Sequence, residues 1–547
     1  MPTDPMASSG PHRQAVCFWR LFGHSLIFPQ SPPRMQLPRS SGVLCHISSL
    51  PSRFGIGDLG PAARTFVDFL ARTEQRYWQV LPIGPVGYGA SPYASPSTFA
   101  GNPAFISPEL LVDDGLLSKT DLKEAPQLPH EHVDFQRAHA VKEELLRRAF
   151  KAFNNGKAPR LREPFSEYCA EETTWLESYA LYTALKHAHD EVAWTDWAPA
   201  YAQREEDALR TFRASHGHEL RYHKFNQFLF DRQWRKLRAY CHARDVQIFG
   251  DLPIYVAHDS ADVWSNQELF HLDEEGHATV VAGVPPDYFS ETGQRWGNPL
   301  YRWERLRATD YDWWVRRLAS VLRRMDVIRL DHFRAFAGYW EIPSHEPTAE
   351  NGRWVEGPGA HFFQTVRNRL GDLPIVAEDL GIITDDVRDL MAQFDLPGMV
   401  VLQFAFGGGT DSIFLPHNYQ KNVVAYTGTH DNDTLLGWWH AEDSTQDAEK
   451  VAAARAYATA YLDLEDADSP TTWPFIRSVM RSSANLALFP VQDLLQLDSS
   501  ARMNTPGNSG ENWAWRMKPG ALTDAVADRL HQETRLFGRG TSTAPFT

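Results

Sequence analysis

Eight short apolar runs, spread along almost the whole chain, restrict its fold more than any other feature. Most of them are continuously apolar, which is typical of parallel strands buried on both faces. Helical patterns lie between them, so the order of elements predicts a (β/α)₈ TIM barrel. The eight runs are residues 42–47, 77–83, 246–249, 326–330, 374–377, 399–404, 423–426 and 487–491, and the clearest helical patterns are 61–73, 311–324, 361–370 and 385–394.

The spacing of the runs is uneven, which predicts large insertions between barrel strands. About 160 residues separate the second run from the third, too many for a crossover, and amphipathic patterns fill them. We therefore expect a mostly helical subdomain at about 86–245, followed by a long loop region at about 255–310. Residues 1–34 are rich in Pro and Ser without periodicity, so we expect a disordered N-terminal extension outside the barrel.

Composition excludes several classes of protein. Asp and Glu number 69 against 54 Lys and Arg, a net charge of −15 that disfavours nucleic acid and anionic membrane surfaces. No stretch is long and apolar enough for a membrane span. The four cysteines lack the spacing of a zinc site or a disulfide framework, which favours the cytoplasm. Eighteen Trp residues favour a sugar polymer as ligand, although ordinary core packing is the alternative explanation.

Four of the expected strands are followed closely by a carboxylate: Asp251, Asp331, Glu378 and Asp431. A single Asp in this position is usually a turn former or a helix cap. Four carboxylates on one rim of the barrel repel one another, and the energetic cost of this repulsion suggests that they have a function. Two carboxylates are the minimum apparatus for cleaving a glycosidic bond. A metal cluster is the competing explanation, but Arg329 shares a strand face with Asp331 and argues against a bound metal.

Longer segments carry a resemblance to a known family. Residues 326–336, 375–381 and 426–434 resemble the conserved regions of the amylomaltases, the 4-α-glucanotransferases (disproportionating enzymes) of glycoside hydrolase family 77 in the α-amylase clan. Residues 250–259, 283–298, 87–93 and 502–507 are similar to that family too, and the match runs from about Leu37 to Trp515. The resemblance implies that residues 35–547 form a catalytic (β/α)₈ barrel.

Carried over position by position, the resemblance implies roles for individual residues. It makes Asp331 the nucleophile, Glu378 the general acid/base and Asp431 the third catalytic carboxylate. The positions that bind substrate around the cleaved bond match Asp251, Arg329, His332 and His430. The positions that contact the glucan along its length match Tyr93, Tyr288, Phe289 and Trp296. A second glucan contact outside the cleft matches Tyr88.

The implied reaction moves a segment of an α-1,4-glucan to the 4-hydroxyl of an acceptor glucan or glucose by retaining double displacement, with no cofactor and no metal. Maltooligosaccharides, amylose, starch or glycogen chains would serve as donor and acceptor, and intramolecular transfer would give cyclic glucans. An α-amylase-type hydrolase is the alternative, because only the acceptor of the second step differs. A glucan-binding protein without catalysis is a further alternative, which the intact carboxylates disfavour. The loop 283–298 favours transfer.

Overall fold

Eight parallel strands form the centre of the molecule, and each falls on one of the eight apolar runs. The structure is a computed structural model that describes residues 37–286, 290–441, 448–466, 470–508, 510 and 512–540; residues 1–34, expected to be an extension, lie outside this range. The strands are β1 (Ser40–Leu44), β2 (Tyr77–Gln79), β3 (Gln247–Pro253), β6 (Val327–Asp331), β9 (Ile375–Ala377), β10 (Gly398–Val401), β11 (Val423–Tyr426) and β12 (Leu486–Pro490).

The eight strands are hydrogen-bonded in the order β10-β11-β12-β1-β2-β3-β6-β9, all in parallel. The remaining seam, between β9 and β10, is bridged by a bond from the Ala377 N–H to the Pro397 carbonyl (2.8 Å). The Asp379 carboxylate accepts a second bond there, from the Met399 N–H at 2.7 Å. The sheet is thus nearly closed, and the predicted barrel is confirmed. Asp379 thus ties the end of β9 to β10.

Helices between the strands cover the barrel at the expected places. They are α1 (Pro61–Arg72), α12 (Asp312–Arg324), α13 (Gly359–Leu370) and α14 (Asp385–Gln393). On α12, Trp313 and Trp314 are buried, as is the guanidinium of Arg317. Adjacent tryptophans on this helix are therefore core residues, whereas the abundance of Trp in the sequence alone left that question open.

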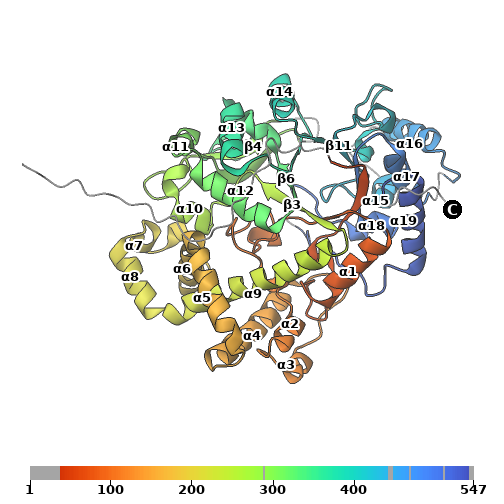
Figure 1. Cartoon of the computed structure of the whole chain (residues 1–547). Coiled ribbons are helices and arrows are strands. Elements are labelled where there is room, and N and C mark those ends of the chain that lie inside the picture. Colours follow the sequence, from red (N-terminus) through yellow and green to blue (C-terminus); the bar gives the residue numbers. More distant parts are fainter. Residues whose placement is uncertain are drawn as a thin grey trace, which may run out of the picture. The chain divides into compact units, whose positions relative to one another are not determined.

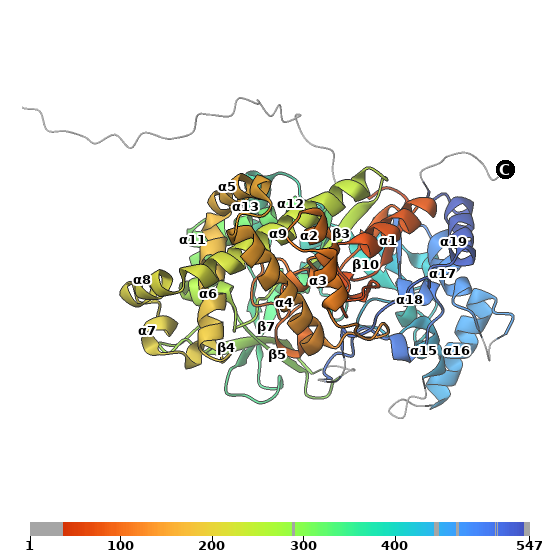
Figure 2. The same ribbon diagram turned by 90° about the horizontal axis from the view of Figure 1, so that it is seen from below.

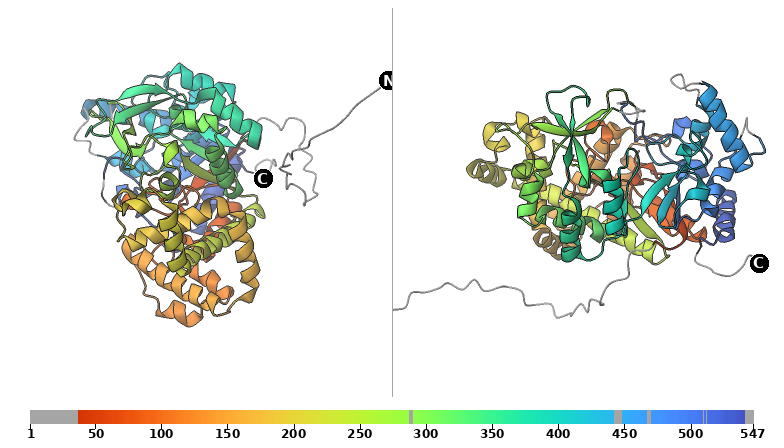
Figure 3. Two further views of the ribbon diagram at one scale, coloured as in Figure 1. Left: turned by 90° about the vertical axis from the view of Figure 1, so that its left-hand side faces the viewer. Right: turned by 90° about the horizontal axis from the view of Figure 1, so that it is seen from above.

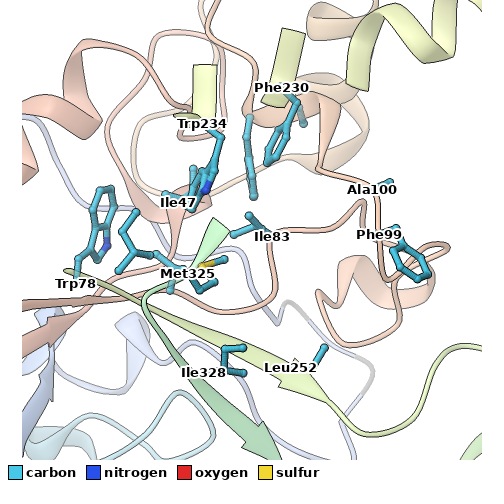
Figure 4. Packing of buried hydrophobic residues seen from close by; sticks show 14 of the residues in the cluster. Ile47, Trp78, Ile83, Phe99, Ala100, Phe230, Trp234, Leu252, Met325 and Ile328 are labelled. Carbon is cyan, nitrogen blue, oxygen red and sulfur yellow. The ribbon is translucent and has the colours of Figure 1, made fainter. Parts of the chain in front are cut away.

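Residues between β2 and β3 form a mostly helical insertion, as their patterns predict. Its helices are α2 (Pro108–Asp113), α3 (Lys119–Glu124), α4 (Phe135–Asn154), α5 (Arg162–Glu171), α6 (Thr173–Ala188), α7 (Pro199–Ala202), α8 (Glu206–Ser215) and α9 (Gly217–His242). In Figure 1 this orange and yellow group lies below and to the left of the labelled strands, and the blue C-terminal helices lie to the right; the left view of Figure 3 shows the orange and yellow helices together at one end. The helix α9 joins the insertion to the barrel core through Phe230 and Trp234, which lie near Ile83 and Met325 (Figure 4).

A small antiparallel sheet, which the sequence patterns did not predict, lies outside the barrel. Its order is β5 (Gln294–Pro299), β4 (Val280–Val284), β7 (Gly338–Pro343) and β8 (Arg353–Glu356), and β4, β5 and β7 lie together in Figure 2. Its strands are short, and an irregularity interrupts the β4–β5 pairing, where Gly297 has a φ of 82°. The region at about 255–310 is therefore partly strand and not wholly loop.

The other α-helices of the described residues lie between and after the barrel strands in the sequence. They are α10 (Ala261–Ser265), α11 (Trp303–Ala308), α15 (Leu435–His440), α16 (Ala448–Leu462), α17 (Trp473–Arg481), α18 (Val491–Leu494) and α19 (Asp524–Leu536). Within the described ranges, no helix combines the length and apolar character that crossing a membrane requires.

One buried arginine fastens the end of the described chain to the barrel. Arg539 is 1% exposed and donates to the carbonyls of Met480 (2.6 Å), Ser40 (2.8 Å) and Ala484 (3.0 Å), which lie around the starts of β1 and β12. Its bonds tie together segments that are more than 400 residues apart in the sequence.

We predict that Arg539→Ala lowers the free energy of unfolding by about 3 kcal/mol, because several buried carbonyls lose a short hydrogen bond. Chemical denaturation of the purified chain measures this loss. Arg388→Ala is the control, since Arg388 pairs with Asp385 on the surface of α14 and should change stability by less than about 0.5 kcal/mol. Equal effects of the two substitutions would contradict the anchoring role.

Candidate active site

Arg329 joins two of the four predicted carboxylates. The β3–β6 register pairs Asp251 with Arg329 and Pro253 with Asp331, so all three charged side chains come from the same end of adjacent strands. One guanidinium nitrogen of Arg329 lies 2.7 Å from Asp251, and the other lies 2.7 Å from Asp331. The side chain of Arg329 is 5% exposed and that of Asp251 is fully buried, so water screens these ion pairs weakly.

Glu378 follows β9 and is held by two backbone amides. The β6–β9 register pairs Leu330 with Ala377, which places the next residues, Asp331 and Glu378, side by side. The Glu378 carboxylate accepts bonds from the N–H groups of His332 (2.8 Å) and Leu380 (2.9 Å). His332 has a φ of 51°, a left-handed conformation that is uncommon for a residue other than Gly. This turn aims its N–H at Glu378, an example of backbone strain at a candidate functional site.

Asp431 lies in the segment after β11 and is positioned by residues near the end of the chain. Its Oδ1 accepts a bond from the Asn504 amide at 2.6 Å, and its carbonyl accepts one from Arg502 at 2.8 Å. The imidazole of His430 approaches the other oxygen at 3.4 Å. Sequence reasoning noted the segment 502–507 only as similar to the family and gave its residues no role.

Aromatic rings line this group of carboxylates. The Tyr93 hydroxyl donates to Asp251 at 2.8 Å, and its ring stacks on His430 with centroids 5.2 Å apart. Trp513 packs beside both rings, at 5.7 and 5.8 Å. On the other side, Trp296 meets the ring of His332 edge to face at 4.7 Å and is 39% exposed. A cavity of about 50 Å³ begins at Tyr93 and Asp251 and extends between β3 and α12.

Burial sets the protonation of these groups. It raises the pKa of Asp331 to about 8, although Arg329 lowers it and the nearby carboxylates add to the rise. Burial also raises the pKa of Glu378, opposed by Arg329 and by the two amides. For Arg329, burial opposes the charge, but Asp251 and Asp331 outweigh it and raise the pKa. Arg329 opposes the rise in the pKa of Asp331 without cancelling it, because desolvation of the carboxylate exceeds the attraction.

The structure brings most of the predicted site residues together. Direct contacts join one group, which is Asp251, Arg329, Asp331, Tyr93, His430 and Asp431. His332 binds Glu378 and meets Trp296, and Tyr255 packs beside both rings. The two groups meet where His332 follows Asp331 in the chain and where the charges of Asp331 and Glu378 interact. Tyr88 does not join them: it is 87% exposed on the short 3-10 turn Tyr88–Ala90. Tyr288 and Phe289 lie outside the described residues. Within the described ranges, no group of three or more His, Cys, Asp or Glu side chains is arranged to hold a metal ion.

A (β/α)₈ barrel with neighbouring carboxylates at the carboxyl ends of its strands is the architecture of many enzymes that act on sugars. Comparison with known proteins makes the assignment specific. The family described as 4-alpha-glucanotransferase matches residues 45–523, and the chain belongs to this family.

The relatives cover nearly the whole chain. A 4-alpha-glucanotransferase of Thermus thermophilus is 48% identical over 498 residues, which are 91% of this chain and 98% of that protein. Another from Synechocystis is 48% identical over 504 residues, 92% of this chain and 98% of that protein. Among solved structures, the amylomaltase of Streptococcus agalactiae in complex with acarbose aligns with a TM-score of 0.86 and 38% identity, covering 92% of this chain and 100% of that chain.

A buried carboxylate that sequence reasoning missed, Asp493, holds both ends of the segment that carries Asp431. It follows β12 and accepts bonds from the Thr427 hydroxyl (2.7 Å) and the Leu435 N–H (2.9 Å). Burial, with a contribution from Asp433, raises the pKa of Asp493 to about 7. The residue falls on the start of a helix after an apolar run, where an Asp is ordinarily read as a helix cap.

We predict that Asp493→Asn removes a pH dependence of stability. The folded chain keeps a proton that the unfolded chain releases near pH 4, so stability falls by up to about 4 kcal/mol as the pH rises from 4 to 7. The amide oxygen of Asn can accept from the Leu435 N–H, and its NH2 group can donate to the Thr427 hydroxyl oxygen, so both contacts are kept without a charge. Urea unfolding should therefore show the variant more stable than the parent at pH 8, with a smaller difference at pH 5. A difference that is the same at both pH values would contradict this assignment.

Proposed function

We propose that this chain transfers a segment of an α-1,4-glucan to the 4-hydroxyl of an acceptor glucan or glucose with retention of configuration. The observation that supports it most is the grouping of Asp331, Glu378 and Asp431 around Arg329 in a member of the 4-alpha-glucanotransferase family. An acidic group beside a nucleophilic carboxylate is what cleavage through a covalent intermediate requires.

In the first step, Asp331 attacks the anomeric carbon of the donor while Glu378 protonates the glycosidic oxygen. The reducing-end part of the donor leaves with that proton, and a glucosyl ester remains on Asp331. In the second step, Glu378 takes the proton from the 4-hydroxyl of the acceptor, whose oxygen displaces Asp331. Intramolecular attack by the same glucan would give a cyclic product.

The protonation state needed for the first step is one proton on the Asp331–Glu378 pair. Burial raises the pKa of both carboxyls, which favours retention of a proton at neutral pH. The two charges interact, so this proton belongs to the pair. Arg329 touches Asp331 directly and does not touch Glu378 in this way, which favours the negative charge on Asp331 and the proton on Glu378.

The surrounding residues have binding and positioning roles in this proposal. Asp431 would accept hydrogen bonds from sugar hydroxyls, with Asn504 fixing its orientation. Around the cleaved bond, Asp251, Arg329, His332 and His430 would contact the sugar, and Tyr93 and Trp296 offer ring faces along the glucan. Tyr88 would contact a second glucan outside the cleft, in keeping with its exposure.

We further propose that the donors and acceptors are maltooligosaccharides or the chains of amylose, starch or glycogen, and that the enzyme acts in the cytoplasm without nucleic-acid or membrane partners. The net charge of −15 supports the last point. Cys45, Cys169 and Cys241 are free thiols, which fits a reducing compartment.

Incubation with maltotriose tests this function against hydrolysis. Transfer disproportionates the trisaccharide into longer oligosaccharides and glucose, whereas hydrolysis gives shorter sugars only, because water takes the place of the acceptor. We expect longer products from the earliest time points. A product profile without any sugar longer than maltotriose would favour the α-amylase-type alternative.

We also predict that the loop 283–298 protects the covalent intermediate from water. Aromatic faces at Tyr288, Phe289 and Trp296 would stack on the acceptor ring and displace water from the intermediate. Tyr288→Ala or Phe289→Ala should therefore lower transfer and raise the fraction of turnovers that end in hydrolysis, with the melting temperature unchanged. Glucose release measured with and without added acceptor gives both rates. An equal fall of transfer and hydrolysis in both variants would contradict selection of the acceptor by this loop.

A further inference from the structure

Two large apolar side chains, Trp354 and Ile382, are exposed beside the candidate active site without a place in the proposed chemistry. Trp354 belongs to β8 and is 45% exposed, and Ile382 follows β9 and is 51% exposed. They come from segments 28 residues apart, yet one side chain, Arg334, contacts both. We call this pair, with Arg334 beneath it, the Trp354 platform.

The platform is held in place by specific contacts. The guanidinium of Arg334 lies 3.9 Å from the centroid of the Trp354 ring, and one of its nitrogens donates to the Ile382 carbonyl at 2.6 Å. On the sheet, Trp354 is paired with Trp340, whose ring meets it at 5.2 Å and 67°. Trp340 is itself fixed by a bond from its indole N–H to the Ala349 carbonyl. An exposed Trp is thus kept in one orientation, at the cost of its rotamer freedom.

The platform is continuous with the group of carboxylates. Glu378 accepts bonds from the amides of His332 and Leu380, and Arg334 and Ile382 lie two residues beyond these amides. Two residues span at most about 7 Å, so Ile382 lies close to Glu378 along the chain. Both segments follow the carboxyl ends of barrel strands, β6 and β9, which is the face of the barrel where substrates bind.

We propose that the Trp354 platform is an outer binding site for the α-1,4-glucan chain, next to the turns that hold Glu378. This inference rests on the proposed function and extends it to substrate length. Glu378 exchanges its proton with the oxygen of the departing or incoming glucan. A sugar chain that continues from the cleaved bond past Glu378 is therefore part of that departing or incoming glucan. A flat indole face and a neighbouring aliphatic side chain suit the C–H face of a pyranose ring. The charged groups beside them, Arg334 and Arg353, are already engaged with the Ile382 carbonyl and with Glu341.

The site predicts a dependence on glucan length. A trisaccharide fills the subsites around the cleaved bond, but only a longer chain reaches Trp354. We expect Trp354→Ala to raise KM for maltoheptaose by roughly three- to tenfold, the range of an aromatic stacking contact, and to leave KM for maltotriose within about twofold. Ile382→Ala should act in the same direction with a smaller effect, because Arg334 binds the backbone carbonyl of Ile382 and is retained.

The experiment measures kcat and KM for both sugars with the parent chain, Trp354→Ala, Trp354→Phe and Ile382→Ala. The control is Leu536→Ala, since Leu536 is 47% exposed on α19, whose following residue Phe537 binds Arg39 ahead of β1, at the opposite end of the barrel. Leu536→Ala should change neither KM, and Trp354→Phe should restore much of the affinity for maltoheptaose.

Two outcomes would overturn the proposal: unchanged KM for both sugars, or an equal loss for both, which would mean that Trp354 acts only through Arg334 on the position of Glu378. Calorimetric titration of maltoheptaose into the same proteins separates this result from a failure of the proposed function. If the parent chain made no transfer products and Trp354→Ala still weakened maltoheptaose binding, the result would support the platform as a binding site and contradict the proposed reaction. Equal binding by parent and variant would remove the platform.

Discussion

The ion pairs of Arg329 with Asp251 and Asp331 are the interaction on which the candidate site depends. Four carboxylates gathered at one end of the barrel strands repel one another, and desolvation of Asp331 and Glu378 favours their neutral forms. One guanidinium with two carboxylate partners at 2.7 Å offsets part of that cost. It also fixes the relative positions of the ends of β3 and β6, because its two bonds follow the register of those strands.

The site is therefore inseparable from the closure of the barrel. Glu378 meets Asp331 only because β9 lies beside β6, and the last seam next to it is bridged by the Ala377–Pro397 bond and the Asp379 carboxylate. Asp431 reaches the same place from β11, on the other side of this seam. A (β/α)₈ barrel brings such residues together at one face although they are distant in the sequence.

Much of the environment that adjusts the carboxylates comes from outside the barrel strands. The backbone turn at His332 supplies an amide to Glu378, and the segment near Asn504 orients Asp431. Asp493 fixes the ends of the segment that carries Asp431 from within the core. These contacts explain how each of these carboxylate side chains is held in one orientation.

The sequence by itself determined the eight strands, the flanking helices and the helical insertion, because continuous apolar runs and amphipathic periodicity are local properties of the chain. It also pointed to the four carboxylates and to Arg329, since each follows or lies within a strand and neighbouring strands end at one face. Residue patterns alone left two interpretations of these carboxylates, sugar chemistry and a metal site. The resemblance to the family then implied a role for each residue.

Only the tertiary structure decided the rest. The antiparallel sheet of β4, β5, β7 and β8 depends on pairings between distant short strands, which leave weak periodicity. The partners of Asp431 and Glu378 are an amide from residue 504 and two backbone groups, and no local pattern marks them. The pKa of Asp331 could not be predicted from the sequence either. It depends on how deeply Asp331 is buried and on how closely Arg329 approaches it, and both are properties of the folded chain.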